Sequence, residues 1–490
     1  MHPIFGIREI VDEILSWIPR EELTTTARVN SFWFFASLPN LWTRVKLMEA
    51  LRPLVVNGGS TEDEYLVNLP TPAQWDRFVI YSEHVRVLLG CGQDVPILMN
   101  ATRWRPRTID YFFPNLHSLI WHTPTIFIRR TPDFSFLLSP RLQNVSLELF
   151  GVRPSSFQLL CETLSTRVQT LRTLQLNING LLGVTIKFLN PILKTSASNL
   201  IQVQMPPEFQ TEETLQWLRK LPRLRRLSFC AAFDPTFDEE SVMNTGGVNE
   251  YHDEQKKESF RSLEKLTFTG SQRAFFDNFL NKSTLSSLAV VYWHTCLEID
   301  DPSSFFRTVS IVCPLLTTLT IGDFEMYLHE RRLPPIIPWT TVRVILNCKF
   351  LTGLSLHCCR VSMTPEELVE VLTSRPYWTP SKWEALEIYT ADPLSIFDFL
   401  LYARYCPHLK TLGIHLNGNS FDDTAIKQAQ EQVTDNRLQD EHVGPNRFTR
   451  LTLIKLAFSS WRPLQAPRFV LFLMKKCDVE PSIEPWQWRL

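Results

Sequence analysis

Glycine is scarce in this sequence, with 16 among 490 residues. Loops that hold phosphate groups are commonly built from glycine, so the composition disfavours a nucleotide-binding protein. The sequence also lacks a C-x-x-C pair, an H-E-x-x-H motif and a G-x-S-x-G motif, which are typical of zinc, metalloprotease and hydrolase sites. We therefore expect a protein that is not an enzyme, with no catalytic residues, no bound metal and no cofactor.

Long apolar runs and a net charge are missing as well. No stretch approaches the roughly 18 apolar residues that a membrane helix needs, and Arg8, Glu9, Asp12 and Glu13 interrupt the first apolar stretch, unlike a signal peptide. The 50 Lys and Arg residues balance 51 Asp and Glu residues, which disfavours nucleic acid or a membrane as partner. Ten cysteines without a secretion signal predict reduced thiols and a cytoplasmic and/or nuclear location.

A Leu-x-x-Leu-x-apolar pattern recurs along the chain at a mean spacing of about 31 residues, near the range of leucine-rich repeats. The last two apolar positions are two residues apart, so they lie on the same face of a short strand. A weaker copy at Val85 and Leu88 precedes the others. The twelve clear copies begin at Leu116, Leu142, Leu171, Leu200, Leu224, Leu263, Leu285, Leu316, Leu351, Trp383, Leu409 and Leu453.

Helical patterns lie between these copies. Thr364, Pro365 and Glu367 form a capping-box signal that predicts a helix ending before Arg375-Pro376, and residues 394–401 predict a second helix. Alternation of strand and helix predicts a parallel sheet with helices covering one face. The alternative is that Leu-x-x-Leu marks amphipathic helices of an all-helical protein.

Several copies begin with cysteine. Cys313, Cys348 and Cys406 precede the apolar residues of their copies, and Cys359 follows one of them. These copies resemble the cysteine-containing class of leucine-rich repeats, which implies small buried thiols in the turns rather than metal ligands.

The first fifty residues have a different pattern. Apolar residues from Ile7 to Ile18 at helical spacing predict a helix that ends at Pro19; residues 20–29 predict a second helix and Ser31 to Ala36 a third, followed by Leu38-Pro39-Asn40-Leu41-Trp42. The spacing of Glu9, Ile14-Leu15, Leu23, Val29, Trp33 and Trp42 resembles the F-box over about residues 5–46. One departure is that Gly6-Ile7 stands where that family usually has Leu-Pro.

The combined pattern resembles an F-box protein with C-terminal leucine-rich repeats of the expanded fungal type. We expect an α/β fold, in which a three-helix F-box precedes an irregular leucine-rich-repeat solenoid with a curved parallel sheet and helices on its convex side. The expected segments are 1–48 for the F-box, 49–80 for a linker and the solenoid entry, 81–476 for the repeats and 477–490 for a C-terminal tail.

By this resemblance, the chain is the substrate receptor of a Skp–cullin–F-box ubiquitin ligase. Its F-box binds a Skp-type adaptor, and through it a cullin, while the repeats bind a protein substrate. Two alternatives remain open: a stand-alone binding scaffold whose N-terminal helices only cap the solenoid, and a sensor of a small ligand. The residues expected in the adaptor-facing surface or the core behind it are Ile10, Ile14, Leu15, Pro19, Leu23, Val29 and Trp33.

The residues between and beside the apolar pair of each strand form the other face of the predicted sheet. Among 36 such positions the charged ones are Glu148, Arg226, Lys265, Glu387 and Lys455, which favours a protein or peptide partner over nucleic acid. Residues 231–260 are acidic and residues 417–447 are polar; solvated loops are the default interpretation, and an acidic loop that grips a basic substrate is the alternative. The candidate substrate-binding residues are Tyr292, Trp293, His294, Phe324, Tyr327, His357 and Tyr389.

Overall fold

The chain forms two compact units, unit 1 (Met1–Ser262) and unit 2 (Leu263–Leu490). The fold is known from a computed structural model. It describes residues 7–54, 69–122, 134–150, 154–179, 186–206, 209, 211–229, 260, 262–269, 285–291, 302–322, 336–373, 383–406, 408–416, 424, 427–428, 431, 450–458 and 482–486.

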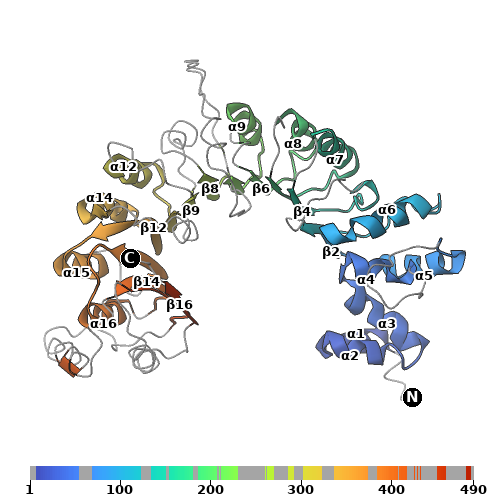
Figure 1. Cartoon of the computed structure of the whole chain (residues 1–490), viewed down its shortest axis with the longest axis horizontal. Coiled ribbons are helices and arrows are strands. Elements are labelled where there is room, and N and C mark those ends of the chain that lie inside the picture. The colour runs from blue at the N-terminus through green and yellow to red at the C-terminus, as the bar shows by residue number, and fades with distance from the viewer. Residues whose placement is uncertain are drawn as a thin grey trace. The chain divides into compact units, whose positions relative to one another are not determined.

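Unit 1 begins with three helices and continues as alternating strands and helices (Figure 1). Strands β1 to β7 lie side by side in chain order, and each neighbouring pair is parallel. The described elements are α1 (Arg8–Trp17), α2 (Arg20–Thr26), α3 (Ser31–Trp42), β1 (Arg44–Lys46), α4 (Leu47–Leu51), the 3-10 helix η2 (Arg52–Leu54), α5 (Pro72–Ser82), β2 (Val87–Cys91), η3 (Gly92–Asp94), α6 (Val95–Trp104), β3 (Ser118–His122), η4 (Phe134–Phe136), β4 (Asn144–Phe150), α7 (Pro154–Arg167), β5 (Thr173–Asn179), η5 (Ile186–Phe188), α8 (Asn190–Thr195), β6 (Gln202–Met205), α9 (Glu212–Arg219) and β7 (Arg226–Phe229).

Unit 2 repeats the same architecture without the three-helix start. Its sheet has the order β8-β9-β10-β12-β13-β14-β15-β16, with β11 beside β12, and these pairs are also parallel. The described elements are β8 (Lys265–Thr269), β9 (Ser287–Val291), α12 (Pro302–Val312), β10 (Thr318–Ile321), β11 (Ile336–Pro338), α14 (Trp339–Arg343), η8 (Val344–Asn347), β12 (Gly353–Ser362), α15 (Pro365–Thr373), β13 (Ala385–Thr390), α16 (Ile396–Tyr405), β14 (Thr411–Leu416), β15 (Leu453–Phe458) and β16 (Ser482–Trp486).

Each unit has its core between the sheet and its helices. In β4 the apolar positions Val145 and Leu147 are buried, as is Leu142 in the turn before the strand, while the alternate residue Ser146 is only half-buried. The helices of each unit lie along the outer side of its strands (Figure 1). The predicted fold, a leucine-rich-repeat solenoid after an N-terminal helical segment, is confirmed.

The turns before the strands are held by a recurring hydrogen bond. Thr317 Oγ1 donates to the carbonyl of Ser286 at 2.7 Å, and Thr352 Oγ1 donates to the carbonyl of Thr317 at 3.3 Å. In these repeats the hydroxyl satisfies a backbone acceptor of the previous repeat, so the neighbouring repeats stabilise one another as expected in a solenoid. Cys313, Cys348, Cys359 and Cys406 are all buried, as predicted.

The expected helix starts are largely correct. Thr364 and Glu367 form the predicted capping box before α15, with the Thr364 amide donating to Glu367 Oε2 at 2.8 Å and the Glu367 amide to Thr364 Oγ1 at 3.2 Å. The helix expected at 394–401 begins at Ile396, because Ser395 is its N-cap and accepts from the Asp398 amide.

Two local predictions are wrong. The third helix does not end at Ala36 but runs through Pro39 to Trp42, because burial of Leu38 beyond Ala36 outweighs the one backbone hydrogen bond that proline removes. The second helix ends at Thr26 instead of approaching Val29.

The last repeat is shifted by two residues from its expected register. Leu412 of β14 pairs with Ile454, and Ile414 pairs with Leu456. The repeat therefore begins at Leu451, which is fully buried like Ile454, rather than at Leu453. Strand residues two apart point to the same face, so both registers fit the sequence pattern.

Candidate functional site

The three N-terminal helices have a hydrophobic core of their own. Val11 and Leu15 of α1, Leu23 of α2 and Ala36 of α3 form one buried cluster, and Ile18, Trp33 and Leu41 pack against it. Asn30 caps α3, since its side chain accepts a hydrogen bond from the Trp33 amide at 3.0 Å. We call residues Arg8–Trp42 the helical module.

Helix α1 carries a second apolar stripe beside the buried one. Ile10, Ile14 and Trp17 fall within about a quarter of the helix circumference at 3.6 residues per turn, and Ile7 is the extended N-cap residue directly before the helix. Ile7 is 47% exposed and Trp17 is 80% exposed, whereas Ile10 and Ile14 are half-buried. This stripe is not used by the module's own core.

The structure divides the predicted adaptor-binding residues into two groups. Leu15 and Leu23 are buried in the module core, while Pro19 and Val29 are exposed. Ile10, Ile14 and Trp33 are half-buried. The predicted set therefore combines core residues with surface residues.

Three exposed apolar side chains of the module were not predicted. They are Trp17 and, on α3, Phe32 and Phe35, of which Phe35 is 54% exposed. A sequence signal existed for Trp17, because it continues the stripe of Ile7, Ile10 and Ile14 at helical spacing. Phe32 and Phe35 gave no such signal, since Ser31–Ala36 is apolar on every side of the helix.

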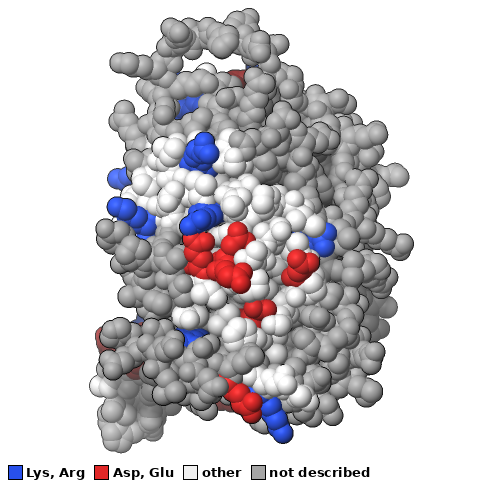
Figure 2. All heavy atoms as spheres, turned by 90° about the vertical axis from the view of Figure 1, so that its left-hand side faces the viewer, with Lys and Arg blue, Asp and Glu red and all other residues white. Residues whose placement is uncertain are grey.

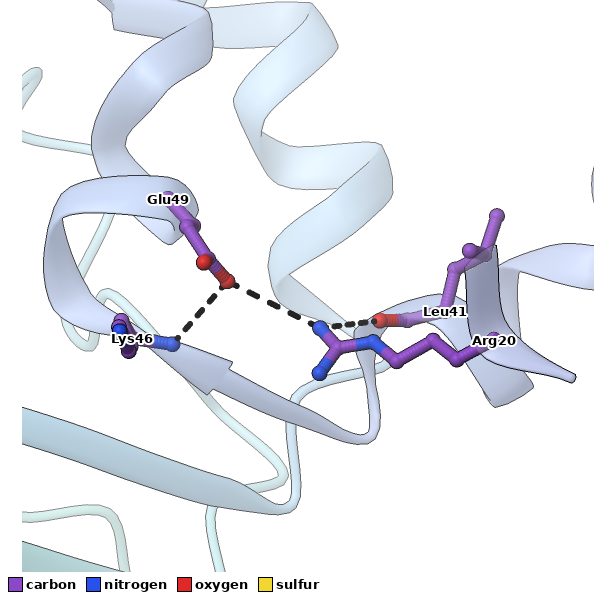
Figure 3. A network of polar contacts seen from close by, with 4 residues as sticks. All are labelled: Arg20, Leu41, Lys46 and Glu49. Atoms are coloured by element: carbon purple, nitrogen blue, oxygen red, sulfur yellow. Dashed lines mark hydrogen bonds and ion pairs between the residues drawn. The ribbon is translucent and has the colours of Figure 1, made fainter. Parts of the chain in front are cut away.

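A small polar network attaches the helical module to the start of the sheet (Figure 3). Arg20 of α2 donates to the Leu41 carbonyl at 3.3 Å and lies 3.8 Å from Glu49 Oε2 of α4. Glu49 Oε2 also accepts from the Lys46 amide at 3.5 Å. Arg20 is half-exposed, so this network orients the module more than it stabilises the fold.

Aromatic packing makes a second attachment. The Trp42 ring stacks on Tyr81 of α5 with centroids 4.5 Å apart, and Phe34 meets the same ring edge-on at 6.2 Å. The module and the solenoid entry are therefore directly joined. Strand β1 at Arg44–Lys46 lies inside the segment 1–48, so the sheet already begins there.

The polar face of the unit 1 sheet is accessible. Gln175, Asn177 and Gln204 are half-buried on this face, and Gln204 Nε2 donates to Asn177 Oδ1 at 3.0 Å. His122 Nδ1 lies 2.9 Å from Glu148 Oε2, and their side chains are 62% and 29% exposed. We call the residues of this face on β3–β7 the amide face.

On strands β12–β14 of unit 2 the corresponding face is buried, whereas on β8 and β10 Lys265 is exposed and Thr318 and Thr320 are half-buried. Ser355 donates to Glu387 Oε1 at 3.2 Å, and His357 Nε2 lies 3.5 Å from Glu387 Oε2. Two of the predicted substrate-binding residues lie here: His357 is 7% exposed and Tyr389 is 1% exposed, with ring centroids 6.1 Å apart. Burial leaves neither side chain available to a partner in this conformation.

The other predicted substrate-binding residues lie outside the described residues. These are Tyr292, Trp293, His294, Phe324 and Tyr327, and the segments 231–259 and 432–447 are likewise not described.

The side of unit 2 shown in Figure 2 carries a group of acidic side chains near basic ones, within a largely uncharged surface. Among the charged residues of unit 2, Glu366 and Glu367 lie in the first turn of α15, and Arg343 of α14 forms an ion pair with Glu370. Both signs occur together, so this surface favours neither a polyanion nor a polycation.

The described residues can be set against the requirements of a metal site, of a membrane span and of a nucleophilic thiol. Within it, no three or more His, Cys, Asp and Glu side chains are grouped to hold a metal ion. No described helix is long and apolar enough to cross a membrane. Burial raises the pKa of the Cys313 and Cys406 thiols to about 12, which makes them poor nucleophiles near neutral pH.

Comparisons with known proteins give only distant similarity. No protein-family model and no curated protein matches the sequence. An internalin from Listeria monocytogenes is 13% identical, with 76% of this chain and 82% of that chain covered and a TM-score of 0.32. The complex of Rad7 and Elc1 from yeast is 13% identical, with 97% of this chain and 91% of that chain covered and a TM-score of 0.36. These values are too low to transfer a function.

Proposed function

We propose that this chain is the non-catalytic substrate-recognition subunit of a Skp–cullin–F-box ubiquitin ligase. The helical module binds a Skp-type adaptor, and the repeats bind the protein to be ubiquitinated. Ubiquitin transfer is then the task of other subunits, acting in the cytoplasm and/or the nucleus.

The observation that carries the proposal is the exposed apolar stripe of α1. The helix buries Val11 and Leu15 inside the module and still presents Trp17 to solvent, next to the exposed N-cap residue Ile7. Exposed apolar residues grouped on one helix face are typical of a surface that binds another protein. The F-box-like spacing of the same segment supports a Skp-type adaptor as that partner.

A role for the module as a mere end cap is less well supported. The module has a hydrophobic core of its own, while the beginning of the unit 1 core is formed by Leu47, Leu51 and Leu54 of α4 and η2 and by Phe78 of α5, all fully buried. Helix α4 packs against β2, α5 and α6. Helices α4 and α5 therefore cover the N-terminal end of the unit 1 core, and helices α1 to α3 form a separate module next to them.

The test is binding of the full chain to a purified Skp-type adaptor, measured by titration calorimetry. We expect Ile14→Asp and Trp17→Ala each to weaken binding roughly tenfold or more, because large apolar side chains dominate interface energies. Ile311→Asp is the matched control, since Ile311 is 71% exposed on α12. Leu15→Asp is unsuitable, because it places a charge in the module core and unfolds it.

Two results would contradict the proposal. One is that the wild-type chain does not bind any Skp-type adaptor; the other is that Ile14→Asp and Trp17→Ala bind as tightly as the control. Deleting residues 1–42 distinguishes this proposal from the alternative of a stand-alone scaffold. The deletion removes the helical module but keeps β1, so the sheet remains complete. A solenoid that unfolds on this deletion supports the end-cap role, whereas one that stays folded but loses the adaptor supports a separate module.

A further inference from the structure

We propose that the amide face of unit 1, together with the arginines at its strand entries, binds an extended polypeptide segment that carries acidic residues. This names the substrate class of the receptor described above and rests on that function.

The amide face offers unused hydrogen-bonding groups. Gln175 and Gln202 are half-buried, and their side chains form no hydrogen bond with a described residue. Gln204 uses an N–H on Asn177 Oδ1, which leaves Gln204 Oε1 as an acceptor and Asn177 Nδ2 as a donor. A peptide group needs one donor and one acceptor from its partner, so this pair matches the main chain of a bound segment.

The strand entries beside these amides are basic. Arg172 precedes β5, Arg226 begins β7, and Arg223 lies in the turn before β7; all three are exposed. Among the described residues, none of them forms an ion pair or a side-chain hydrogen bond. Thr173, Gln202 and Arg226 are in register across β5, β6 and β7, which places Arg226 roughly 10 Å from the backbone next to Arg172.

This positive charge is local, since unit 1 as a whole contains 27 Lys and Arg residues and 27 Asp and Glu residues. Residues 69–229 contain 18 Lys and Arg residues against 10 Asp and Glu residues. In unit 2 the strand-entry positions before β8 and β13 hold Glu264 and Glu384 instead, and Lys410 before β14 lies 3.2 Å from Glu384. At the strand entries an acidic segment would meet Arg172, Arg223 and Arg226 in unit 1, whereas in unit 2 the exposed Lys265 that begins β8 directly follows Glu264.

A polypeptide fits this surface better than nucleic acid does. Glu148 lies on the same face, partly exposed, and would repel a continuous phosphate backbone. From β4 to β7 the face spans about 14 Å, the length of about four extended residues. The segment would place acidic side chains at Arg172 and Arg226 and its main chain over Gln175 and Gln204.

The test is fluorescence anisotropy with the full chain and labelled 12-residue probes. Three Gly/Ser-based peptides carry glutamates, lysines or no charge, and a single-stranded DNA oligonucleotide serves as a second polyanion. We expect the glutamate peptide to bind most tightly and to weaken as salt is added. The double variant Arg172→Glu/Arg226→Glu should lose roughly tenfold or more in its affinity for this peptide.

Two variants define the control and the contribution of the amides. Arg77→Glu/Arg103→Glu reverses two exposed arginines on α5 and α6 of the same unit and should bind like the wild type. Gln175→Ala/Gln204→Ala should weaken binding of the glutamate peptide without changing its salt dependence.

The proposal would be overturned if no peptide binds, if all three peptides bind equally, or if the oligonucleotide binds more tightly than the glutamate peptide. It would also be overturned if Arg77→Glu/Arg103→Glu loses as much affinity for the glutamate peptide as Arg172→Glu/Arg226→Glu. None of these outcomes affects adaptor binding, which depends on the helical module and is measured separately. Failure of this proposal is therefore distinguishable from failure of the proposed function.

Discussion

Strands β3–β7 of unit 1 and β12–β14 of unit 2 form the same kind of parallel sheet, but their polar faces differ in burial. In unit 1 the residues at corresponding strand positions, such as Ser146, Gln175 and Gln204, are half-buried, and in unit 2 Ser355 and Glu387 are buried. The apolar face is alike in both units, since Leu174 and Leu354 are both fully buried. The repeat pattern therefore specifies the apolar core between sheet and helices in both units. It does not specify the residues on the opposite face of the sheet, which differ between the units.

The difference has a physical consequence for binding. Buried polar groups must be satisfied inside the protein because water cannot reach them. In unit 2, Ser355 is engaged by Glu387, and His415 Nδ1 lies 2.9 Å from the Thr390 carbonyl. Unit 1 keeps its amides and arginines accessible, so its polar face is better suited to a partner than the buried face of β12–β14.

The largest expected difference in stability is between substitutions of Glu387 in unit 2 and Glu148 in unit 1. Glu387→Ala removes a buried carboxylate next to His357 and Ser355, and we expect a loss of about 3 kcal/mol in the free energy of unfolding. Glu148→Ala in unit 1 removes a partly exposed carboxylate, and a loss below about 1 kcal/mol is expected. Hydrogen exchange of β12–β14 and of β3–β5 measures the two effects separately.

Glu387→Gln serves as the control, because the amide oxygen still accepts a hydrogen bond from Ser355. It should cost less than Glu387→Ala. Equal losses in the free energy of unfolding for Glu387→Ala and Glu148→Ala would contradict the conclusion that Glu387 lies on a buried polar face and Glu148 on an accessible one.

A second, smaller difference in stability is expected between Gly413→Ala in unit 2 and Ser146→Ala in unit 1. A Cβ at this position would lie 2.7 Å from Tyr389 Oη and 2.9 Å from Glu387 Cβ. Gly413→Ala should therefore cost about 2 kcal/mol through overpacking. In unit 1, Ser146→Ala on the accessible face should change stability by less than about 0.5 kcal/mol. Thermal unfolding checks both, and a neutral Gly413→Ala would indicate that the unit 2 face is loosely packed.

The smallest expected effect is a pH dependence of stability in unit 2 that comes from His415. Desolvation lowers the pKa of His415, opposed in part by its hydrogen bond to the Thr390 carbonyl. The folded state then binds fewer protons than the unfolded state below about pH 6.5. Stability is therefore complete above that pH and falls as the pH is lowered through it towards the pKa of the folded state.

Local measurement is needed, because burial also lowers the pKa of His84 in unit 1. Hydrogen exchange in β13 and β14 should accelerate between about pH 7.5 and about pH 5.5, after correction for intrinsic rates. His415→Gln should reduce this response. If hydrogen exchange in His415→Gln depends on pH as it does in the wild type, the pH dependence comes from other titratable groups.

Much of the fold could be predicted because its signals are local. The spacing of Leu142, Val145 and Leu147 is that of a turn followed by a strand, and the capping box at Thr364 fixes the start of α15. The register of β15 could not be predicted in this way, because Leu451 and Leu453 occupy equivalent positions in the pattern. Pairing with β14 decided between them.

The candidate site was predicted by residue type more than by role. Ile14 and Leu15 are adjacent and chemically similar, yet one helps to form the exposed stripe of α1 and the other fills the module core. The resemblance to the F-box placed both in one set. Only the packing of α1 against α2 and α3 separates a residue for binding from a residue for folding.

The amino-acid sequence by itself determined where strands and helices alternate, because apolar periodicity and capping residues act over a few positions of the chain. The tertiary structure alone decided which polar strand residues became internal partners and which stayed accessible. That choice depends on side chains brought together from distant repeats, as with Ser355 and Glu387, and such proximity is not encoded in any single repeat.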